Sequence, residues 1–285
     1  MSGETLYARV NGTRIAYEVS GQGYPLLLLH GFPRTRRTWE KVTPALAARF
    51  TVCALDRRGY GDSDRPADAA TYDNGFMTKD AYELTRHLGW DQFMVAGHDR
   101  GAPTARRLAA DHPEAVRGVM ILDNPPQGVN IPQRPDTTGR TWYFAFFRQR
   151  GVAEQLIGQN PRLFFSLFLD RNPHLNAEEH EHYVQMLSRR GGVEAILADY
   201  RAGLEVDPLH WEEELKAGRK VTVPLYVIWG DRGPSASAPM LDAWRQAATD
   251  VRGEAVADSA HYIQEEQPQA TAQHVMRFAD ELGIP

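Results

Sequence analysis

The chain has 285 residues, of which 42% are hydrophobic and 24% are charged. This composition is typical of a globular rather than a disordered protein, and the length suits one large α/β domain or a core domain with an insertion. A net charge of −5 without a basic stripe gives no support for nucleic-acid or anionic-membrane binding. No apolar run is long enough to span a membrane, and residues 1–5 lack the features of a signal peptide, so we expect a cytoplasmic location.

Short apolar runs alternate with helix-like stretches in the first and last parts of the chain. Residues 6–10 and 14–19 flank Asn11-Gly12, which is a strong hairpin signal. The continuous apolar runs that follow are typical of strands covered on both faces. Their alternation with helices predicts an α/β fold, with a mostly parallel eight-stranded sheet flanked by helices. The other predicted strands are 25–29, 51–55, 93–96, 118–122, 225–229 and 253–257, and the helices are 77–88, 103–112 and 267–282.

The pattern changes between residues 127 and 219. Long β-branched runs are absent there, and aromatic runs at 142–147 and 163–169 occur among polar helical stretches such as 177–188. We therefore predict a helical cap, or lid, inserted after the sixth strand over residues 127–219. Residues 1–126 and 220–285 then form the core domain. Helical insertions of this kind commonly cover an active site.

The segment Gly97-His98-Asp99-Arg100-Gly101 lies between a predicted strand and a predicted helix. This is the setting of a nucleophile elbow, in which small residues on either side of the nucleophile allow a tight, strained turn. The residue at the apex is Asp99, whose carboxylate can displace a leaving group from a saturated carbon and be held as an ester. Such a short motif also matches ordinary glycine-rich turns, so the interpretation depends on partner residues elsewhere.

Three other features also follow predicted strands. His30-Gly31-Phe32-Pro33 comes after Leu29, Asp123 comes directly after Leu122, and His261 lies a few residues after the last strand. Because ligands bind beyond the carboxyl ends of parallel strands, we expect these residues and Asp99 at one edge of the sheet. The order nucleophile, acid, base is the order of an α/β-hydrolase.

With these residues in place, the chain resembles α/β-hydrolases over nearly its full length. Within that fold it is similar to the branch with an Asp nucleophile, namely epoxide hydrolases, fluoroacetate dehalogenases and haloalkane dehalogenases. The joint order and spacing of the matching motifs is specific, although each motif alone is not. The motifs are His30-Gly31-Phe32-Pro33, residues 56–63, 97–101 and 121–123, Trp229-Gly230-Asp231 and Ala260-His261-Tyr262.

The resemblance implies a two-step reaction. Asp99 would form an alkyl-enzyme ester, and His261 would remove a proton from the water that hydrolyses it. Asp123 would orient His261 and stabilise its imidazolium form. The backbone N–H groups of Phe32 and Arg100 would hold the oxyanion of the hydrolytic step.

Two carboxylates compete for the role of triad acid. Asp123 lies at a strand end, and residues 229–233 resemble dehalogenases that place the acid after strand six. Asp231 occupies the position after strand seven that many α/β-hydrolases use. We predict Asp123 as the acid, with Asp231 as the alternative. His30 is expected to pack within its loop rather than to act as the base.

The inserted segment has to stabilise the leaving atom. An epoxide oxygen leaves as an alkoxide and needs a proton, which a tyrosine hydroxyl can supply. Tyr143 and Tyr200 stand at positions similar to those of the two lid tyrosines of epoxide hydrolases, and the neighbouring Trp142 is expected to contact the substrate. The alternative is that both tyrosines are ordinary packing residues. The sequence thus predicts an epoxide hydrolase that gives vicinal diols.

The alternative activity is a haloacid dehalogenase of the fluoroacetate type. Asp99-Arg100 resembles the Asp-Arg pair of those enzymes, but Pro103 stands where they carry the second arginine of a carboxylate clamp. A catalytically silent ligand-binding α/β-hydrolase is a third hypothesis. We predict no metal and no cofactor. The expected partners are a small-molecule substrate and water. A homodimer formed through the aromatic residues of the lid is left open.

Overall fold

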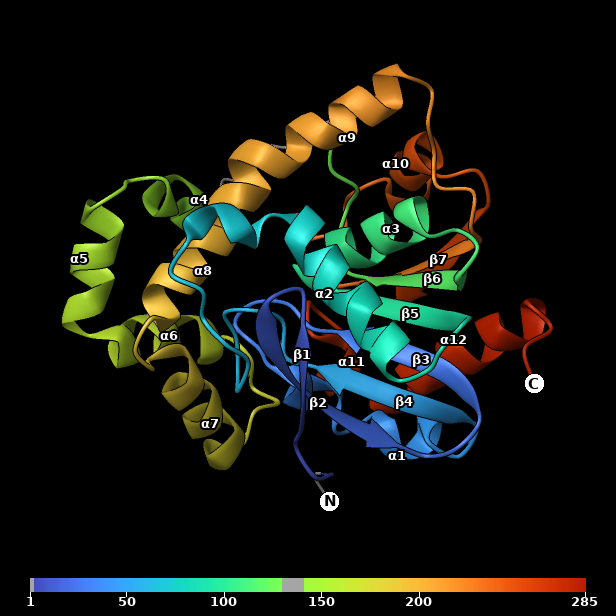
Figure 1. Ribbon diagram of the computed structural model, residues 1–285, viewed down its shortest axis with the longest axis horizontal. Helices are drawn as coiled ribbons and strands as arrows, with labels where there is room; N and C mark the ends of the chain where they lie inside the picture. Colours follow the sequence, from blue (N-terminus) through green and yellow to red (C-terminus); the bar gives the residue numbers. More distant parts are fainter. Residues whose placement is uncertain (1–2, 130–140) are drawn as a thin grey trace.

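The computed structural model describes residues 3–129 and 141–285, and eight strands within these ranges form one sheet (Figure 1). The strand order is β1-β2-β4-β3-β5-β6-β7-β8. The β1–β2 and β2–β4 pairs are antiparallel, and all later neighbours pair parallel. The predicted α/β fold with a mostly parallel sheet is therefore confirmed. The strands are β1 (Leu6–Val10), β2 (Thr13–Ser20), β3 (Tyr24–Leu29), β4 (Phe50–Leu55), β5 (Phe93–His98), β6 (Val116–Leu122), β7 (Leu225–Gly230) and β8 (Val251–Val256).

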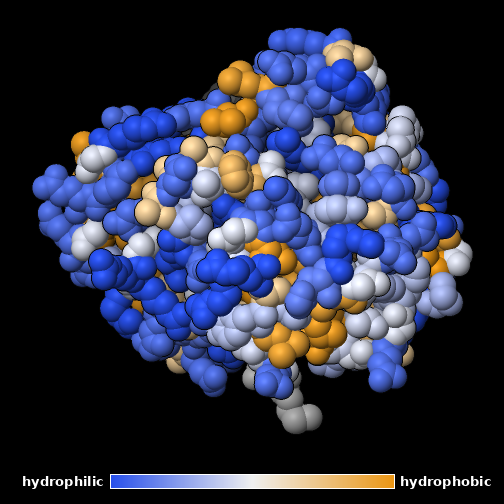
Figure 2. Space-filling model, viewed as in Figure 1, coloured by the Kyte–Doolittle hydropathy of each residue, from blue (hydrophilic) through white to orange (hydrophobic). Residues whose placement is uncertain are grey.

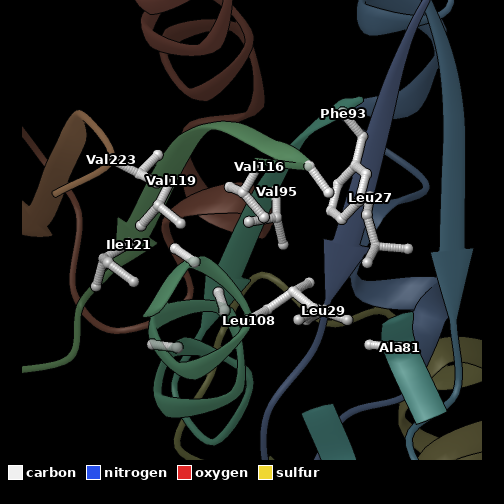
Figure 3. Packing of buried hydrophobic residues seen from close by; sticks show 14 of the residues in the cluster. Leu27, Leu29, Ala81, Phe93, Val95, Leu108, Val116, Val119, Ile121 and Val223 are labelled. Atoms are coloured by element: carbon white, nitrogen blue, oxygen red, sulfur yellow. The ribbon is translucent and has the colours of Figure 1, made fainter. Parts of the chain in front are cut away.

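Both faces of the sheet are covered, which explains the continuous apolar runs of the central strands. Because successive side chains point to opposite faces, Leu27 and Leu29 of β3 belong to one core cluster and Leu26 and Leu28 to the other. Figure 3 shows Leu27, Leu29 and Val95 packed beside Leu108 in the first cluster. Each fully buried leucine of this kind contributes about 2 kcal/mol of hydrophobic stabilisation.

Helices on the two faces provide the rest of each core. Residues of α2, α3 and α10 pack into the first cluster, and residues of α1 and α12 pack into the second. Helix α2 begins three residues earlier than expected, because the Asp73 side chain accepts a hydrogen bond from Phe76 N–H and caps the helix. These helices are α1 (Thr43–Leu46), α2 (Asn74–His87), α3 (Gly101–Asp111), α10 (Met240–Ala247), α11 (Ile263–Glu266) and α12 (Pro268–Glu281), with short 3₁₀ turns at Arg36–Trp39 and Ala69–Tyr72.

The described residues between β6 and β7 are mainly helical and lie to one side of the sheet (Figure 1). We call the segment 142–216 the inserted helices. They have an aromatic cluster of their own, in which Phe147, Phe165 and Tyr200 pack around Phe32 from the loop after β3. They are α4 (Trp142–Phe147), α5 (Val152–Gln159), α6 (Pro161–Leu169), α7 (Ala177–Leu187), α8 (Gly192–Arg201), the π-helical stretch η3 (Ala202–Val206) and α9 (Asp207–Lys216).

The surface agrees with the charged composition. The face shown in Figure 2 is mostly hydrophilic, with small separate hydrophobic groups. Among the described helices, none combines the length and the apolar character needed to cross a membrane.

Candidate active site

The turn between β5 and α3 places Asp99 at the edge of the sheet. Asp99 has a φ of +49°, a left-handed conformation that is costly for a residue other than glycine. The turn is so tight that a Cβ atom on Gly97 would lie 2.5 Å from the carbonyl oxygen of Gly101. This geometry explains the small residues on both sides of Asp99, and it presents the carboxylate beyond the carboxyl end of β5.

Asp99, His261 and Asp123 come together at this edge. The Asp99 Oδ2 atom lies 3.4 Å from His261 Nε2, and His261 Nδ1 lies 2.5 Å from Asp123 Oδ2. The Asp123 side chain is fully buried, whereas those of Asp99 and His261 are 18% and 23% exposed. A buried carboxylate behind the imidazole and a partly open carboxylate in front of it form an arrangement suited to nucleophilic catalysis with a general base.

The charges in this arrangement reinforce one another. Burial raises the pKa of Asp99, but the hydrogen bond and positive charge of His261 outweigh it and hold this pKa well below its ordinary range. Burial lowers the pKa of His261, but the hydrogen bonds and charges of Asp123 and Asp99 raise it to about 10. The resting site therefore pairs an ionised Asp99 with an imidazolium at neutral pH.

Two other histidines near the site, His30 and His98, are fully buried. His98 Nε2 is 2.8 Å from the backbone carbonyl oxygen of His261, and burial lowers the His98 pKa to about 3. His30 accepts a hydrogen bond from the Arg57 N–H at Nε2, and burial lowers its pKa to about 4. Both rings are thus neutral, and their hydrogen bonds are with backbone groups rather than with Asp99.

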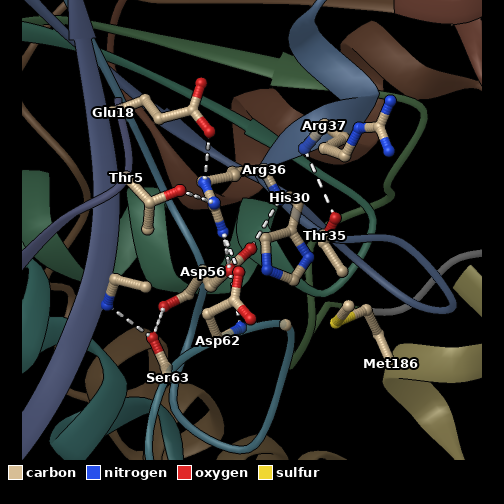
Figure 4. Close-up of polar contacts among 12 residues, drawn as sticks. Thr5, Glu18, His30, Thr35, Arg36, Arg37, Asp56, Asp62, Ser63 and Met186 are labelled. Atoms are coloured by element: carbon tan, nitrogen blue, oxygen red, sulfur yellow. Dashed lines mark hydrogen bonds and ion pairs between the residues drawn. The ribbon is translucent and has the colours of Figure 1, made fainter. Parts of the chain in front are cut away.

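The Phe32 N–H donates to Asp99 Oδ1 over 2.8 Å, and the Arg100 N–H helps to lower the pKa of Asp99. These are the two backbone donors that the sequence predicted for the oxyanion site. The loop that carries Phe32 is held by a buried network around Arg36 and Asp56, drawn in Figure 4. The Arg36 N–H donates to Asp56 Oδ1 over 2.8 Å, and its guanidinium reaches Glu18 Oε1 at 2.8 Å.

The segment after His261 is held by a second buried network. Glu265 accepts two hydrogen bonds from Arg34, at 2.7 and 3.0 Å, and one from the Thr38 hydroxyl at 2.6 Å. The Asn172 amide, from the inserted helices, donates to the same carboxylate over 2.7 Å. This glutamate therefore connects the loop after β3, helix α11 and the inserted helices near the edge of the sheet that carries Asp99.

Tyr143 and Tyr200 lie together beside Phe32. Their ring centroids are 5.7 Å apart, and the Tyr200 ring packs edge-on against Phe32 at 5.1 Å. Each tyrosine contributes to the pKa of the other. Burial and the negative charge of Asp99 raise the pKa of Tyr143, and burial also raises that of Tyr200, so both hydroxyls stay protonated. Both hydroxyls are close enough to Asp99 for its charge to affect their pKa values.

Trp142 and Arg100 occupy different surroundings from Asp99, Asp123 and His261. Trp142 is 41% exposed, and its ring stacks against Phe168 at 6.3 Å and lies edge-on to Tyr143. The Arg100 guanidinium is buried and pairs with Asp199 Oδ1 at 2.7 Å. The Arg100 guanidinium is thus paired with a carboxylate of the protein, whereas the predicted role in substrate binding would have it contact the substrate.

Asp231, the alternative acid, has surroundings different from those of Asp123. Its Oδ1 atom accepts a hydrogen bond from the Ser259 N–H over 3.2 Å, and its side chain is 41% exposed. The His261 Nδ1 atom is directed at Asp123 instead.

Among the described residues, no group of three or more His, Cys, Asp or Glu side chains could hold a metal ion.

Two residues at the site were not singled out from the sequence. The Asn124 side-chain amide donates to the Asp99 backbone oxygen over 3.1 Å, and Asp199 holds Arg100. Asn124 follows Asp123 directly at the end of β6, so its position was a usable signal. Asp199 is a single charge in the apolar stretch 195–200, where an ionised group needs a buried partner.

The chain belongs to the α/β-hydrolase fold family, which matches residues 24–268. It is 34% identical to the soluble epoxide hydrolase of Corynebacterium sp. (strain C12) over 95% of each chain. It is 32% identical to a fluoroacetate dehalogenase of Burkholderia sp., over 91% of this chain and 88% of that protein. The crystal structure of Cfl2 from Burkholderia cenocepacia is similar with a TM-score of 0.87 and 33% identity, over 96% of this chain and 95% of that one. The fold and these enzyme relatives support hydrolase activity.

Proposed function

We propose that this protein is an epoxide hydrolase that acts through an ester on Asp99. The observation that carries the proposal is the position of two adjacent, protonated tyrosines near an ionised Asp99 that is paired with His261. This combination offers a nucleophile for carbon and a proton for the departing oxygen in one place. The similarity to a soluble epoxide hydrolase is in line with it.

The first step forms the ester. Asp99 Oδ1 already accepts the Phe32 N–H, so Oδ2 is the oxygen available for attack. Its electron pair forms a bond to an epoxide carbon, and the carbon–oxygen bond of the ring breaks. The oxygen takes a proton from Tyr143 or Tyr200. Without this proton it would leave as a high-energy alkoxide. The products of this step are a hydroxyalkyl ester on Asp99 and a tyrosinate that regains its proton at the end of the second step.

The second step hydrolyses the ester. His261 Nε2 takes a proton from a water molecule, whose oxygen attacks the Asp99 carbonyl carbon. The carbonyl oxygen is then Oδ1, and its developing charge falls on the Phe32 and Arg100 N–H groups, each worth roughly 3 kcal/mol in comparable sites. Asp123 stabilises the imidazolium. Collapse of the adduct releases the diol, returns the proton from His261 to the leaving oxygen and leaves Asp99 as a carboxylic acid. The proton of this acid passes through solvent to the tyrosinate, which restores the starting state.

Ester hydrolysis is expected to follow a pKa below the value of about 10 that His261 has beside ionised Asp99. Esterification removes the charge of Asp99, one of the two carboxylates that raise the His261 pKa. Since His261 is a base only when deprotonated, the hydrolysis rate should rise with pH through this lowered pKa and then become constant. Single-turnover hydrolysis rates between about pH 5 and about pH 10 give the His261 pKa in the ester form. An NMR titration of the unreacted protein gives the His261 pKa beside ionised Asp99 for comparison. An equal or higher pKa in the ester form would contradict the mechanism.

Tyr143→Phe and Tyr200→Phe are each expected to slow epoxide opening by tens-fold or more, because each removes a proton donor from the developing alkoxide. Rapid-quench measurement of ester formation with styrene oxide tests this. Phe144→Leu, which alters a ring packed against both tyrosines without removing a hydroxyl, is the matched control. Full activity in both tyrosine variants would mean that the tyrosines only pack.

A haloacid dehalogenase is the second candidate, favoured by the 32% identity to a fluoroacetate dehalogenase. Such a substrate carries a carboxylate that needs a free cation in the pocket. The Arg100 guanidinium is 3.2 Å or less from Asp199 Oδ1 through two nitrogen atoms, and Pro103 follows where a second arginine would be needed. This charge pairing supports a neutral epoxide over an acidic halide as the substrate.

Incubation with styrene oxide, fluoroacetate and chloroacetate separates the candidates. Diol formation without halide release is the expected result. Halide release without diol formation would make the haloacid dehalogenase the correct assignment. Inactivity toward all three, with retained binding of one of them, would favour the ligand-binding hypothesis.

We also propose that residues 127–219 act as the cap over this site, with residues 1–126 and 220–285 as the core domain. The contacts of Phe32 with Phe147, Phe165 and Tyr200 support this division. Asp99 as the nucleophile, a cytoplasmic location and a homodimer remain predictions. They are open to labelling of Asp99, cell fractionation and sedimentation of the purified protein, respectively.

A further inference from the structure

A buried ion pair joins the nucleophile turn to the inserted helices. Arg100 Nη2 donates to Asp199 Oδ1 over 2.7 Å and to the Asp199 backbone oxygen over 2.9 Å, and Arg100 Nε reaches Oδ1 at 3.2 Å. The side chains are 9% and 0% exposed. Two ionised groups removed from water in this way have to stay paired, so the distance between their backbones is strongly constrained.

The sequence positions of the two partners give the ion pair its significance. Arg100 directly follows Asp99, the proposed nucleophile, and Asp199 directly precedes Tyr200, a proposed proton donor. The pair therefore connects, through one contact, the two chain segments from which the reacting groups project. The Arg100 Cζ atom also lies 5.7 Å from the centre of the Tyr200 ring.

The inserted helices provide a specific space for Arg100. The helical segment α8–α9 contains the π-helical stretch η3, and π-helical turns often occur at functional sites. A Cβ atom on Gly203, in this stretch, would lie 2.0 Å from Arg100 Nη1. Any side chain at position 203 would thus displace the guanidinium. Asp207 Oδ2, at the start of α9, is 3.7 Å from Arg100 Nη2 and adds a second negative charge.

Asp199 keeps other partners when Arg100 is altered. Its carboxylate accepts hydrogen bonds from Arg57 at 3.3 Å and from the Tyr60 hydroxyl at 2.7 Å. Loss of the Arg100 guanidinium therefore leaves no unpaired charge on Asp199, and an Arg100→Gln variant is expected to fold.

We infer that Arg100 is a positioning residue, which sets the Tyr200 hydroxyl over the reacting oxygen through its ion pair with Asp199. The inference rests on the proposed function. Tyr200 takes part in ester formation and not in ester hydrolysis, so the Arg100 side chain affects the first step alone. This separates it from a residue that only stabilises the fold, whose loss would impair both steps.

The experiment is a double-mutant cycle on the two half-reactions with styrene oxide. Arg100→Gln, Tyr200→Phe and the double variant are followed by rapid quench and intact-protein mass spectrometry. Arg100→Gln is expected to slow ester formation by about tenfold or more, since small misplacements of reacting groups are costly. It should change ester hydrolysis by less than about threefold, because its backbone N–H remains. In the Tyr200→Phe background the same substitution should slow ester formation by less than about threefold, since interacting residues are non-additive.

Two further variants complete the design. Gly203→Ala keeps the Arg100 charge but displaces the guanidinium, and is expected to reproduce the Arg100→Gln pattern. Arg150→Gln, at an exposed arginine of the inserted helices that pairs with Glu205, is the control and should leave both steps unchanged.

Several results would overturn the inference. These are an unchanged rate of ester formation in Arg100→Gln, equal slowing of both steps, or effects of Arg100→Gln and Tyr200→Phe that multiply independently. Absence of any ester on Asp99 in the unaltered protein would instead overturn the proposed function. The two failures are therefore distinguishable.

Discussion

One atom of heavy oxygen is expected in the Asp99 side chain after a single turnover in heavy-oxygen water. In the proposed mechanism water attacks the Asp99 carbonyl carbon and not the substrate, so its oxygen stays in the carboxylate. The first diol then carries the oxygen that Asp99 supplied. Mass spectrometry of the peptide that contains residue 99 measures the label. Label found only in the diol would contradict a covalent ester.

The same reasoning gives the effect of removing the carboxylate. Asp99→Ala is expected to lower epoxide turnover by on the order of 10⁴-fold or more, because Asp123, the other carboxylate that contacts His261, is fully buried behind the ring and cannot form the ester. Asp231→Asn, at a partly exposed carboxylate of the same sheet edge, is the matched control and should retain activity. Comparable loss in both variants would mean that the edge depends on its charge rather than on a nucleophile.

His261→Gln is expected to stop turnover while the ester still forms. The glutamine cannot take a proton from water, whereas the attack of Asp99 on carbon needs no base. The protein should therefore gain the mass of one substrate molecule, and the added mass should lie on the peptide that contains Asp99. Intact-protein mass spectrometry after mixing with excess styrene oxide gives the measurement.

Substitution of the two candidate acids provides the control for this result. Asp123→Asn should slow ester hydrolysis strongly, since Asp123 Oδ2 lies 2.5 Å from His261 Nδ1, and Asp231→Asn should not. If His261→Gln gave no adduct, or if Asp231→Asn had the larger effect, the assignment of base and acid would have to change.

The order of the strands and helices could be predicted from local pattern, whereas some boundaries could not. Strand β5 continues to His98, two residues beyond its apolar run, because parallel pairing with β6 reaches Leu122. Helix α3 begins at Gly101 rather than at residue 103, because the turn around Asp99 leads directly into it. Strand β8 begins at Val251, two residues before its expected start, paired with Leu225 of β7. Backbone pairing therefore extends both strands beyond the runs that local pattern indicates.

Sequence alone determined which chemical groups meet at the edge of the sheet. Asp99, Asp123 and His261 each follow a strand, and the carboxyl ends of parallel strands lie at the same edge, so their approach follows from chain order. The residue at position 99 also determined that the proposed nucleophile is a carboxylate.

Tertiary structure decided what surrounds those groups. Arg100 and Asp199 are 99 residues apart and lie in different elements, and their ion pair makes Arg100 a contact of the protein rather than a free cation. The choice of Asp123 over Asp231 as the partner of His261 likewise depends on side-chain direction. Both depend on packing between distant segments, and a charge in a linear sequence carries no record of which buried partner it meets.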